Sequence, residues 1–231
     1  IRGVWSTNLV GLTFGFAMFG TFMLIPLLLE LPTATGYGFG RTVSAAGLFL
    51  MPTVITMMIF GLLSGLLDRR FGPKVPMLFG AGAVTAAFAL PAFTHHAIWH
   101  LLVSGLLTGA GIGLAFAAMS NAIVEAVPAT HTGEATSVNT IMRTIGGSIG
   151  TAVVAAVIAA NVTPRGLPTD RAFTEGFWVC AGVGLLAVLA SLALPSARRR
   201  HDQAVAAGVD DLPPEPEHLH LQHRQHPAPG R

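Results

Sequence analysis

Six long segments of this sequence contain almost no charged side chains, and this pattern constrains the fold more than any other feature. The segments cover residues 9–29, 43–66, 75–93, 98–124, 138–160 and 173–194. A membrane hydrocarbon core about 30 Å thick is crossed by about 20 helical residues. Each segment has about this length, so the sequence predicts six membrane-spanning helices.

The overall composition excludes an ordinary water-soluble domain. Only 10% of the 231 residues are charged and 52% are hydrophobic, whereas soluble domains carry about 25% charged residues. Spanning β-strands would appear as short alternating segments, and an open sheet edge cannot lie in lipid. We therefore expect an all-α integral membrane fold in which residues 1–195 form a six-helix transmembrane bundle.

Lys and Arg in the loops predict how the helices are oriented, because these residues favour the cytoplasmic side. If the N-terminus is cytoplasmic, seven basic residues lie inside and three outside. The inner residues are Arg2, Arg69, Arg70, Lys74, Arg198, Arg199 and Arg200. The outer residues are Arg41, Arg165 and Arg171. This bias predicts a multi-pass protein of the cell membrane whose C-terminus is cytoplasmic.

Residues 196–231 differ sharply from the rest of the chain. They are rich in Pro, His, Asp and Glu and poor in large apolar residues, so they cannot bury enough surface to offset the entropy cost of ordering. We expect a disordered cytoplasmic tail. Its histidines could bind a soft divalent metal, but no cysteine or carboxylate cluster stands at ligand spacing. A solvated tail is therefore favoured, and no metal or cofactor is expected.

A short, strongly charged turn, residues 65–74 (G-L-L-D-R-R-F-G-P-K), separates the second and third segments. Gly72 and Pro73 force a tight reversal, and the basic side chains can cap the carbonyl end of the preceding helix. This turn resembles the loop motif G-x-L-x-D-R-x-G-x-[RK] of the major facilitator superfamily. In that family the motif recurs after the second helix of each six-helix half, which is its place here.

The turn follows the family motif at most positions. The residues that match in register are Gly65, Leu67, Arg70, Gly72 and Lys74. Arg69 occupies the acidic position of the motif, and Asp68 stands one residue early. The resemblance implies that this loop latches one conformation of a transporter, and it assigns the latch to Arg70 and Lys74 ahead of Asp68.

Two glycine-rich helices extend the resemblance. Gly109 and Gly113 lie in 98–124, and Gly146, Gly147 and Gly150 lie in 138–160. Glycines at such spacing let helix backbones approach closely. Along the chain, two Pro-containing helices are followed by the loop motif and then by a helix with the pattern R-x-x-G-G-x-x-G. This order, over residues 5–195, is similar to that of the drug:proton antiporter branch with fourteen helices.

Arg143 is the most informative single residue, because it lies about 15 Å of helix beyond Gly133. A charge at the bilayer centre costs about 2.5 kcal/mol or more, so it usually faces a cavity or an acidic partner. Our hypothesis is that Arg143 lines the cytoplasmic half of a translocation path. The alternative is that its side chain reaches the cytoplasmic interface or pairs with Glu125 or Glu134.

Other polar residues could line the same path. Asn121 and Asn139 are candidates, although interhelical hydrogen bonds would equally explain them. No acidic residue lies near the middle of a segment, so the principal proton site is expected outside this chain. Glu30, on the outer side, is the local candidate.

The resemblance implies proton-coupled efflux of drugs or other small amphipathic compounds by a protein of which this chain is the C-terminal half. The expected partners are a small-molecule substrate, protons, the lipid bilayer and the missing N-terminal half, with no nucleic acid. A permease subunit of an ATP-driven transporter and a non-transporting membrane scaffold remain alternatives.

An enzyme is not expected, because no H-E-x-x-H, G-x-S-x-G or P-loop pattern occurs. The catalytic-type residues within the membrane domain concentrate at His95 and His96, with His100 just beyond. Such an interfacial histidine group is expected to be wet and inert.

Overall fold

The computed structural model describes residues 2–127 and 129–192, and it confirms six helices of membrane-spanning length. They are α1 (Arg2–Glu30), α2 (Val43–Phe71), α3 (Lys74–Phe93), α4 (Ile98–Ala126), α5 (Thr132–Ala160) and α6 (Asp170–Leu192). Two short 3-10 turns, η1 (Thr33–Thr35) and η2 (Ala129–His131), lie in the loops. Within the described residues, β pairing is limited to one isolated bridge. The tail predicted for 196–231 lies outside the described residues.

Several helices extend beyond the apolar segments that predicted them. The first was predicted from residue 9 and begins at Arg2, and the fifth was predicted from residue 138 and begins at Thr132. Hydropathy detects only the part of a helix that suits hydrocarbon, whereas backbone hydrogen bonds continue into the polar flanks. The end of α2 is set by Gly72, which adopts φ +77° and donates from its N–H to the Asp68 carbonyl at 2.7 Å.

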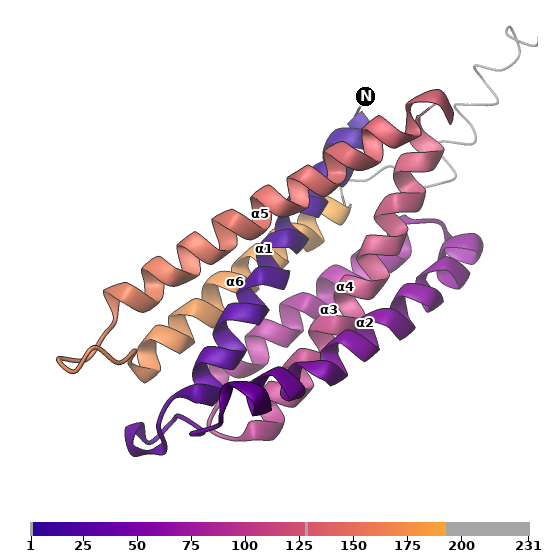
Figure 1. The fold of residues 1–231 in the computed structure, drawn as a ribbon. Coiled ribbons are helices and arrows are strands. Elements are labelled where there is room, and N and C mark those ends of the chain that lie inside the picture. The colour runs from indigo at the N-terminus through magenta and orange to yellow at the C-terminus, as the bar shows by residue number, and fades with distance from the viewer. Residues whose placement is uncertain (1, 128, 193–231) are drawn as a thin grey trace, which may run out of the picture. The chain divides into compact units, whose positions relative to one another are not determined.

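The six helices pack in a defined order. The α1 helix packs against α5 and α6, the α4 helix packs against α2 and α3, and α3 also contacts α6. In the view of Figure 1, α5 and α2 lie on opposite sides, with α1 and α4 between them. In this order α5, α1, α4 and α2 form one broad face of the bundle.

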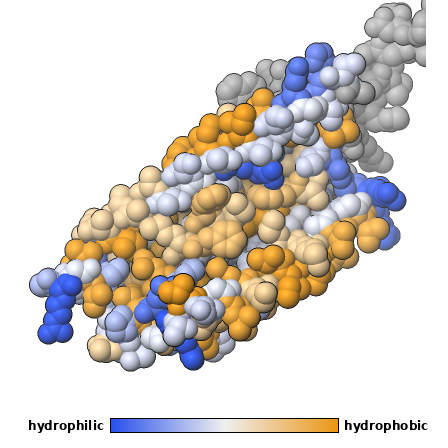
Figure 2. Space-filling model, viewed as in Figure 1, coloured by the Kyte–Doolittle hydropathy of each residue, from blue (hydrophilic) through white to orange (hydrophobic). Residues whose placement is uncertain are grey.

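The interior and the surface of the bundle are both largely apolar. Large aromatic side chains fill the interior, among them Phe14, Phe88, Phe173 and Phe177. The α2 helix exposes most of its apolar side chains, as expected for a helix in contact with lipid. Figure 2 shows strongly hydrophilic residues toward the ends of the helices and one hydrophilic patch on the face between them.

The α1 and α5 helices touch backbone to backbone. A Cβ atom added at Gly146 would lie well within 3.0 Å of the Leu12 carbonyl oxygen, and one added at Gly15 would lie equally close to the Arg143 carbonyl oxygen. No L side chain fits at either position without moving a helix. These two glycines therefore determine how closely α5 approaches α1.

This close approach predicts a strong effect of Gly146→Ala. The added methyl group must displace backbone, and overpacking of this kind costs about 1–3 kcal/mol. The apparent midpoint of thermal unfolding in detergent micelles should fall. The control is Gly82→Ala in α3, where a Cβ meets nothing within 4 Å, and the midpoint should stay equal or rise because Ala is the better helix former. Equal effects of the two substitutions would contradict the packing described above.

Candidate functional site

The α5 helix presents three chemically different sectors along its length. The first consists of exposed hydroxyl side chains, namely Ser137, Thr140, Thr144, Ser148 and Thr151. The second consists of the buried glycines that face α1, namely Gly146, Gly147 and Gly150. The third consists of exposed aliphatic side chains, namely Val138, Ile141, Ile145, Ile149 and Val153. One helix thus combines a packing surface, an apolar surface and a polar surface.

The hydroxyl sector is compatible with a membrane because its groups bond to their own helix. Thr140, Thr144 and Ser148 each donate to the carbonyl oxygen four residues earlier, at 3.1, 3.1 and 3.0 Å. Such local bonds satisfy hydroxyl donors where water is scarce. This sector was not predicted from the sequence, although the spacing of three and four residues between successive hydroxyls is the signal that identifies it.

Arg143 lies on the glycine-lined side of α5, next to the hydroxyl sector, and its side chain reaches across to α4. Its guanidinium carbon lies 4.3 Å from the ring centroid of Phe116, and it donates to the Thr140 hydroxyl at 3.2 Å. Phe116 in turn contacts the ring of Phe14 edge to face, with centroids 6.4 Å apart. A cation over an aromatic ring gains about 0.5–2 kcal/mol, and the gain increases as water is excluded.

Arg143 makes no ion pair with the carboxylates that the structure describes. Glu134, one of the two partners considered from the sequence, lies 3.2 Å from the Nδ1 of His131 instead. The side chain of Glu125, the other partner, is outside the described set. Within the described bundle the charge of Arg143 is therefore held by an aromatic ring and a hydroxyl group.

Asn139 is buried one turn before Arg143 and binds α1. Its side-chain amide donates to the Asn8 side chain at 3.2 Å and to the Thr7 carbonyl at 3.4 Å. A Cβ atom added at Gly11 would contact both Asn139 and Arg143. The structure thus brings Asn139 and Arg143 together against α1, where Asn139 forms the interhelical hydrogen bonds considered from the sequence.

Asn121 binds a different helix, because its side-chain amide donates to the Asp68 carboxylate at 2.5 Å. This bond joins the end of α4 to the end of α2. Asp68 is only 9% exposed, and its backbone carbonyl also accepts the Gly72 N–H that ends α2. Hydrogen bonds to a charged group are about twice as strong as neutral ones. Asp68 therefore joins the loop motif to α4.

The basic residues of the loop differ in their contacts. Arg69 and Arg70 are exposed, and the Arg70 guanidinium lies 5.5 Å from the Phe71 ring centroid. Lys74 donates from Nζ to the carbonyl of Leu192 at 2.8 Å, which ties the start of α3 to the end of α6. Gly65 faces open space. Asp68 and Lys74 thus each bond to another helix, and the assignment of the latch to Arg70 and Lys74 stays a prediction.

Glu30 is exposed at the last residue of α1 and lies far from Arg143. Gly15, which packs on the Arg143 backbone, is separated from Glu30 by about 22 Å of helix. The four residues predicted for a path thus fall into three places: Arg143 with Asn139 on the α1 side of α5, Asn121 at the loop motif, and Glu30 at the opposite end of the bundle.

The expectation that the histidines after α3 are wet is wrong for His95. This side chain is 2% exposed, because it packs beside Phe177 of α6, with ring centroids 6.0 Å apart. Its Nδ1 lies 2.7 Å from the Pro91 carbonyl oxygen and its Nε2 lies 2.9 Å from the Asp170 carboxylate. His96 is exposed, as expected.

Comparison with known proteins gives consistent relatives. Residues 5–225 match the family model described as Major Facilitator Superfamily. A curated relative, "Multidrug resistance protein Stp" of Mycobacterium tuberculosis (strain CDC 1551 / Oshkosh), is 32% identical over 124 residues. The match covers 53% of this chain and 22% of that protein, so the chain spans well under half the length of its curated relative.

Solved transporters share the fold at low sequence identity. A peptide transporter, POT, in complex with sulfate superposes with TM-score 0.70 at 17% identity, covering 90% of this chain and 44% of that chain. A proton:xylose symporter superposes with TM-score 0.67 at 21% identity, covering 86% and 45%. In both cases the six helices correspond to less than half of the longer protein.

The Asp68–Asn121 bond predicts energetic coupling between α2 and α4. Asp68→Asn and Asn121→Ala should each lower the midpoint of thermal unfolding in micelles, because a hydrogen bond to a charged group contributes about 1.5–3 kcal/mol. The double variant should lose less than the sum of the two single losses. Arg69→Gln, in the same loop but exposed, is the control and should have little effect. Additive losses would show that the two side chains do not interact.

Proposed function

The chain belongs to the Major Facilitator Superfamily, and from this membership we propose that it is the C-terminal six-helix half of a proton-coupled efflux transporter. Family membership identifies a multi-pass membrane transporter protein rather than an enzyme. The proposed substrates are drugs or other small amphipathic compounds. The name of the curated relative, a multidrug resistance protein, supports this substrate class.

The observation that carries the proposal is the position of Arg143 beside the hydroxyl sector of α5. A half-buried guanidinium is unfavourable against lipid chains. The self-bonded hydroxyls beside it are compatible with water as well as with lipid, and the aliphatic sector of the same helix suits lipid. The proposal assigns the polar side of α5 to a water-accessible path and the aliphatic side to lipid. Arg143 then lines the path together with Phe116 of α4.

The proposed partner is a second six-helix bundle, the N-terminal half of the same protein. Superposed transporters of known structure are more than twice as long as the matched region. Substrate sites in such transporters lie near the membrane midplane between two repeats that rock against each other. The broad face formed by α5, α1, α4 and α2 is the proposed contact surface for this second bundle.

Protons are the proposed coupling ion, with their principal binding site on the second bundle. A proton-driven carrier needs a protonatable group in its path, and none of the six helices carries a carboxylate near its middle. Glu30, exposed at the end of α1, is the local candidate. The loop charges support a cell-membrane location with the Asp68–Asn121 end of the bundle, and the tail that follows α6, in the cytoplasm.

The role proposed for Arg143 predicts that Arg143→Gln slows drug efflux from cells expressing the full-length protein. Losing the guanidinium over Phe116 should lower the initial rate by roughly tenfold, which corresponds to about 1.4 kcal/mol. Arg143→Lys should retain part of the rate, because the charge remains. The control is Arg165→Gln, an exposed arginine in the loop before α6. Unchanged efflux in Arg143→Gln, at equal protein abundance, would refute the role of Arg143.

Proton coupling predicts that a protonophore abolishes efflux while cellular ATP is maintained. The proton gradient is then the energy source, and its collapse leaves the carrier without a driving force. Dye retention and ATP content should be measured in the same cells. Efflux that persists without the gradient would favour the alternative of a permease driven by an ATPase.

A further inference from the structure

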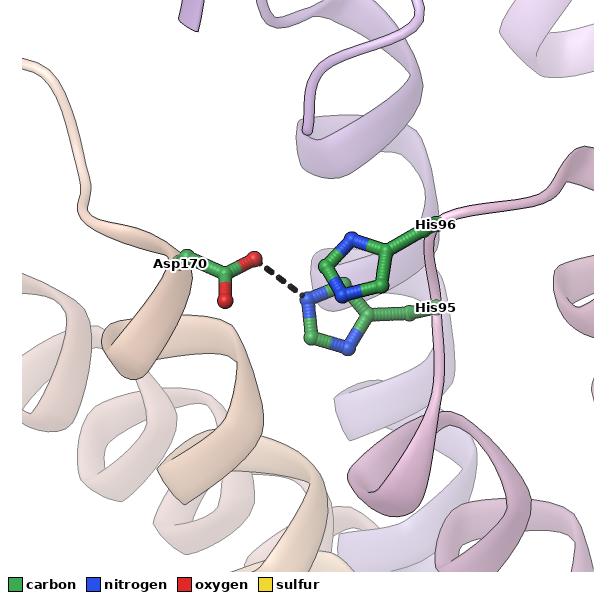
Figure 3. Close-up of side chains that lie close together, drawn as sticks. All are labelled: His95, His96 and Asp170. Atoms are coloured by element: carbon green, nitrogen blue, oxygen red, sulfur yellow. Dashed lines mark hydrogen bonds and ion pairs between the residues drawn. The ribbon is translucent and has the colours of Figure 1, made fainter. Parts of the chain in front are cut away.

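The end of the bundle opposite the Asp68–Asn121 pair contains a cluster that the proposed transport function does not use. His95 and His96 follow α3, and Asp170 is the first residue of α6. One potential ligand atom from each of the three side chains lies within 4.8 Å of the others. Figure 3 shows the Asp170 carboxylate directed at the His95 ring, with the His96 ring beside it.

The hydrogen bond of His95 to the backbone determines which ring nitrogen is free. A carbonyl oxygen only accepts, so the 2.7 Å contact with Pro91 requires the proton on Nδ1. In a neutral imidazole the lone pair then lies on Nε2. Metal-binding histidines almost always donate their other N–H to a carbonyl or carboxylate in this way, which fixes the ring orientation.

The free Nε2 faces an oxygen that also carries lone pairs. Nε2 lies 2.9 Å from Oδ1 of Asp170, and two acceptors at this distance repel each other unless a cation is shared between them. The neighbouring charges do not supply one, because Arg171 donates to Glu175 at 2.6 Å and Glu175 also accepts from Asn161 at 2.9 Å. The cation must therefore be a proton on the pair or a bound ion.

The position of His96 favours a bound ion over a proton. A proton is shared by two atoms only. This site offers a third potential ligand, His96, whose ring centroid lies 5.1 Å from that of His95. The Asp170 side chain is 45% exposed and His96 is exposed, so an ion can enter from water and keep a water ligand. Two imidazoles, one carboxylate and one water form a four-coordinate set typical of zinc.

We propose that His95, His96 and Asp170 bind a divalent transition-metal ion of the zinc class. Zinc lies about 2.0–2.1 Å from such ligands, so tetrahedral geometry needs the Nε2 and Oδ1 atoms about 3.3 Å apart. The half-exposed Asp170 side chain can open the present distance by that amount while His95 stays bonded to Pro91. The bound ion would join the end of α3 to the start of α6. This inference does not depend on the proposed transport function.

The test is a titration of the purified full chain with zinc chloride in detergent micelles. Histidines of the tail must be removed as competing ligands, so all variants carry alanine at 201, 218, 220, 223 and 226. In this background one zinc ion should bind per chain, and cobalt chloride should give the visible absorption of a tetrahedral site. Zinc should also raise the midpoint of thermal unfolding.

Three variants decide the outcome. His96→Ala and Asp170→Asn leave the buried His95 ring in place. Each should weaken zinc binding by at least about tenfold, because the loss of even an outer-shell partner of a metal site costs about tenfold to a hundredfold in affinity. His95→Gln should abolish binding. His131→Ala, beside Glu134 and away from the cluster, is the matched control and should bind normally. Zinc binding that disappears with the tail histidines, or that survives both His96→Ala and Asp170→Asn, would overturn the proposal and leave the pair with a proton only.

Discussion

The structure depends on direct contact between helix backbones. Moving an apolar side chain from lipid into a helix–helix contact gains little free energy, because lipid chains are equally apolar. Helices in a membrane are therefore held together by close packing and by hydrogen bonds. The α1 and α5 helices meet at Gly15 and Gly146, and the α2 and α4 helices meet at Gly109 and Gly113, which lie against Thr53 and Met57. These two pairs form opposite sides of the bundle.

The position of Arg143 follows from these contacts. Gly15 lies against its backbone and Gly11 lies beside the first part of its side chain, which then extends to Phe116 of α4. The same contact turns the aliphatic sector of α5 away from the bundle. The glycine sector occupies only part of the circumference of α5. The remaining circumference therefore has room for both the hydroxyl sector and the aliphatic sector.

The sequence predicted the six helices well because a bilayer imposes a length and a hydropathy that can be read along the chain. Contacts between distant residues could not be predicted in this way. Asp68 and Asn121 are joined because α2 lies against α4, and His95 and Asp170 are joined because α3 lies against α6. His95 appeared wet from the sequence because its neighbours suggested an interface, whereas its burial comes from Phe177 of a different helix. The hydroxyl sector was readable from its spacing and was overlooked.

The hydroxyls of α5 have a further consequence for any molecule that lies along them. Each donates its proton to a carbonyl of its own helix, so the oxygens present lone pairs to the outside and few free protons. The polar side of α5 is thus a row of acceptors interrupted by one cationic donor, Arg143. Such a row attracts positively charged or hydrogen-bond-donating groups without dictating where along the helix they stop, while an anionic group finds a single favourable position.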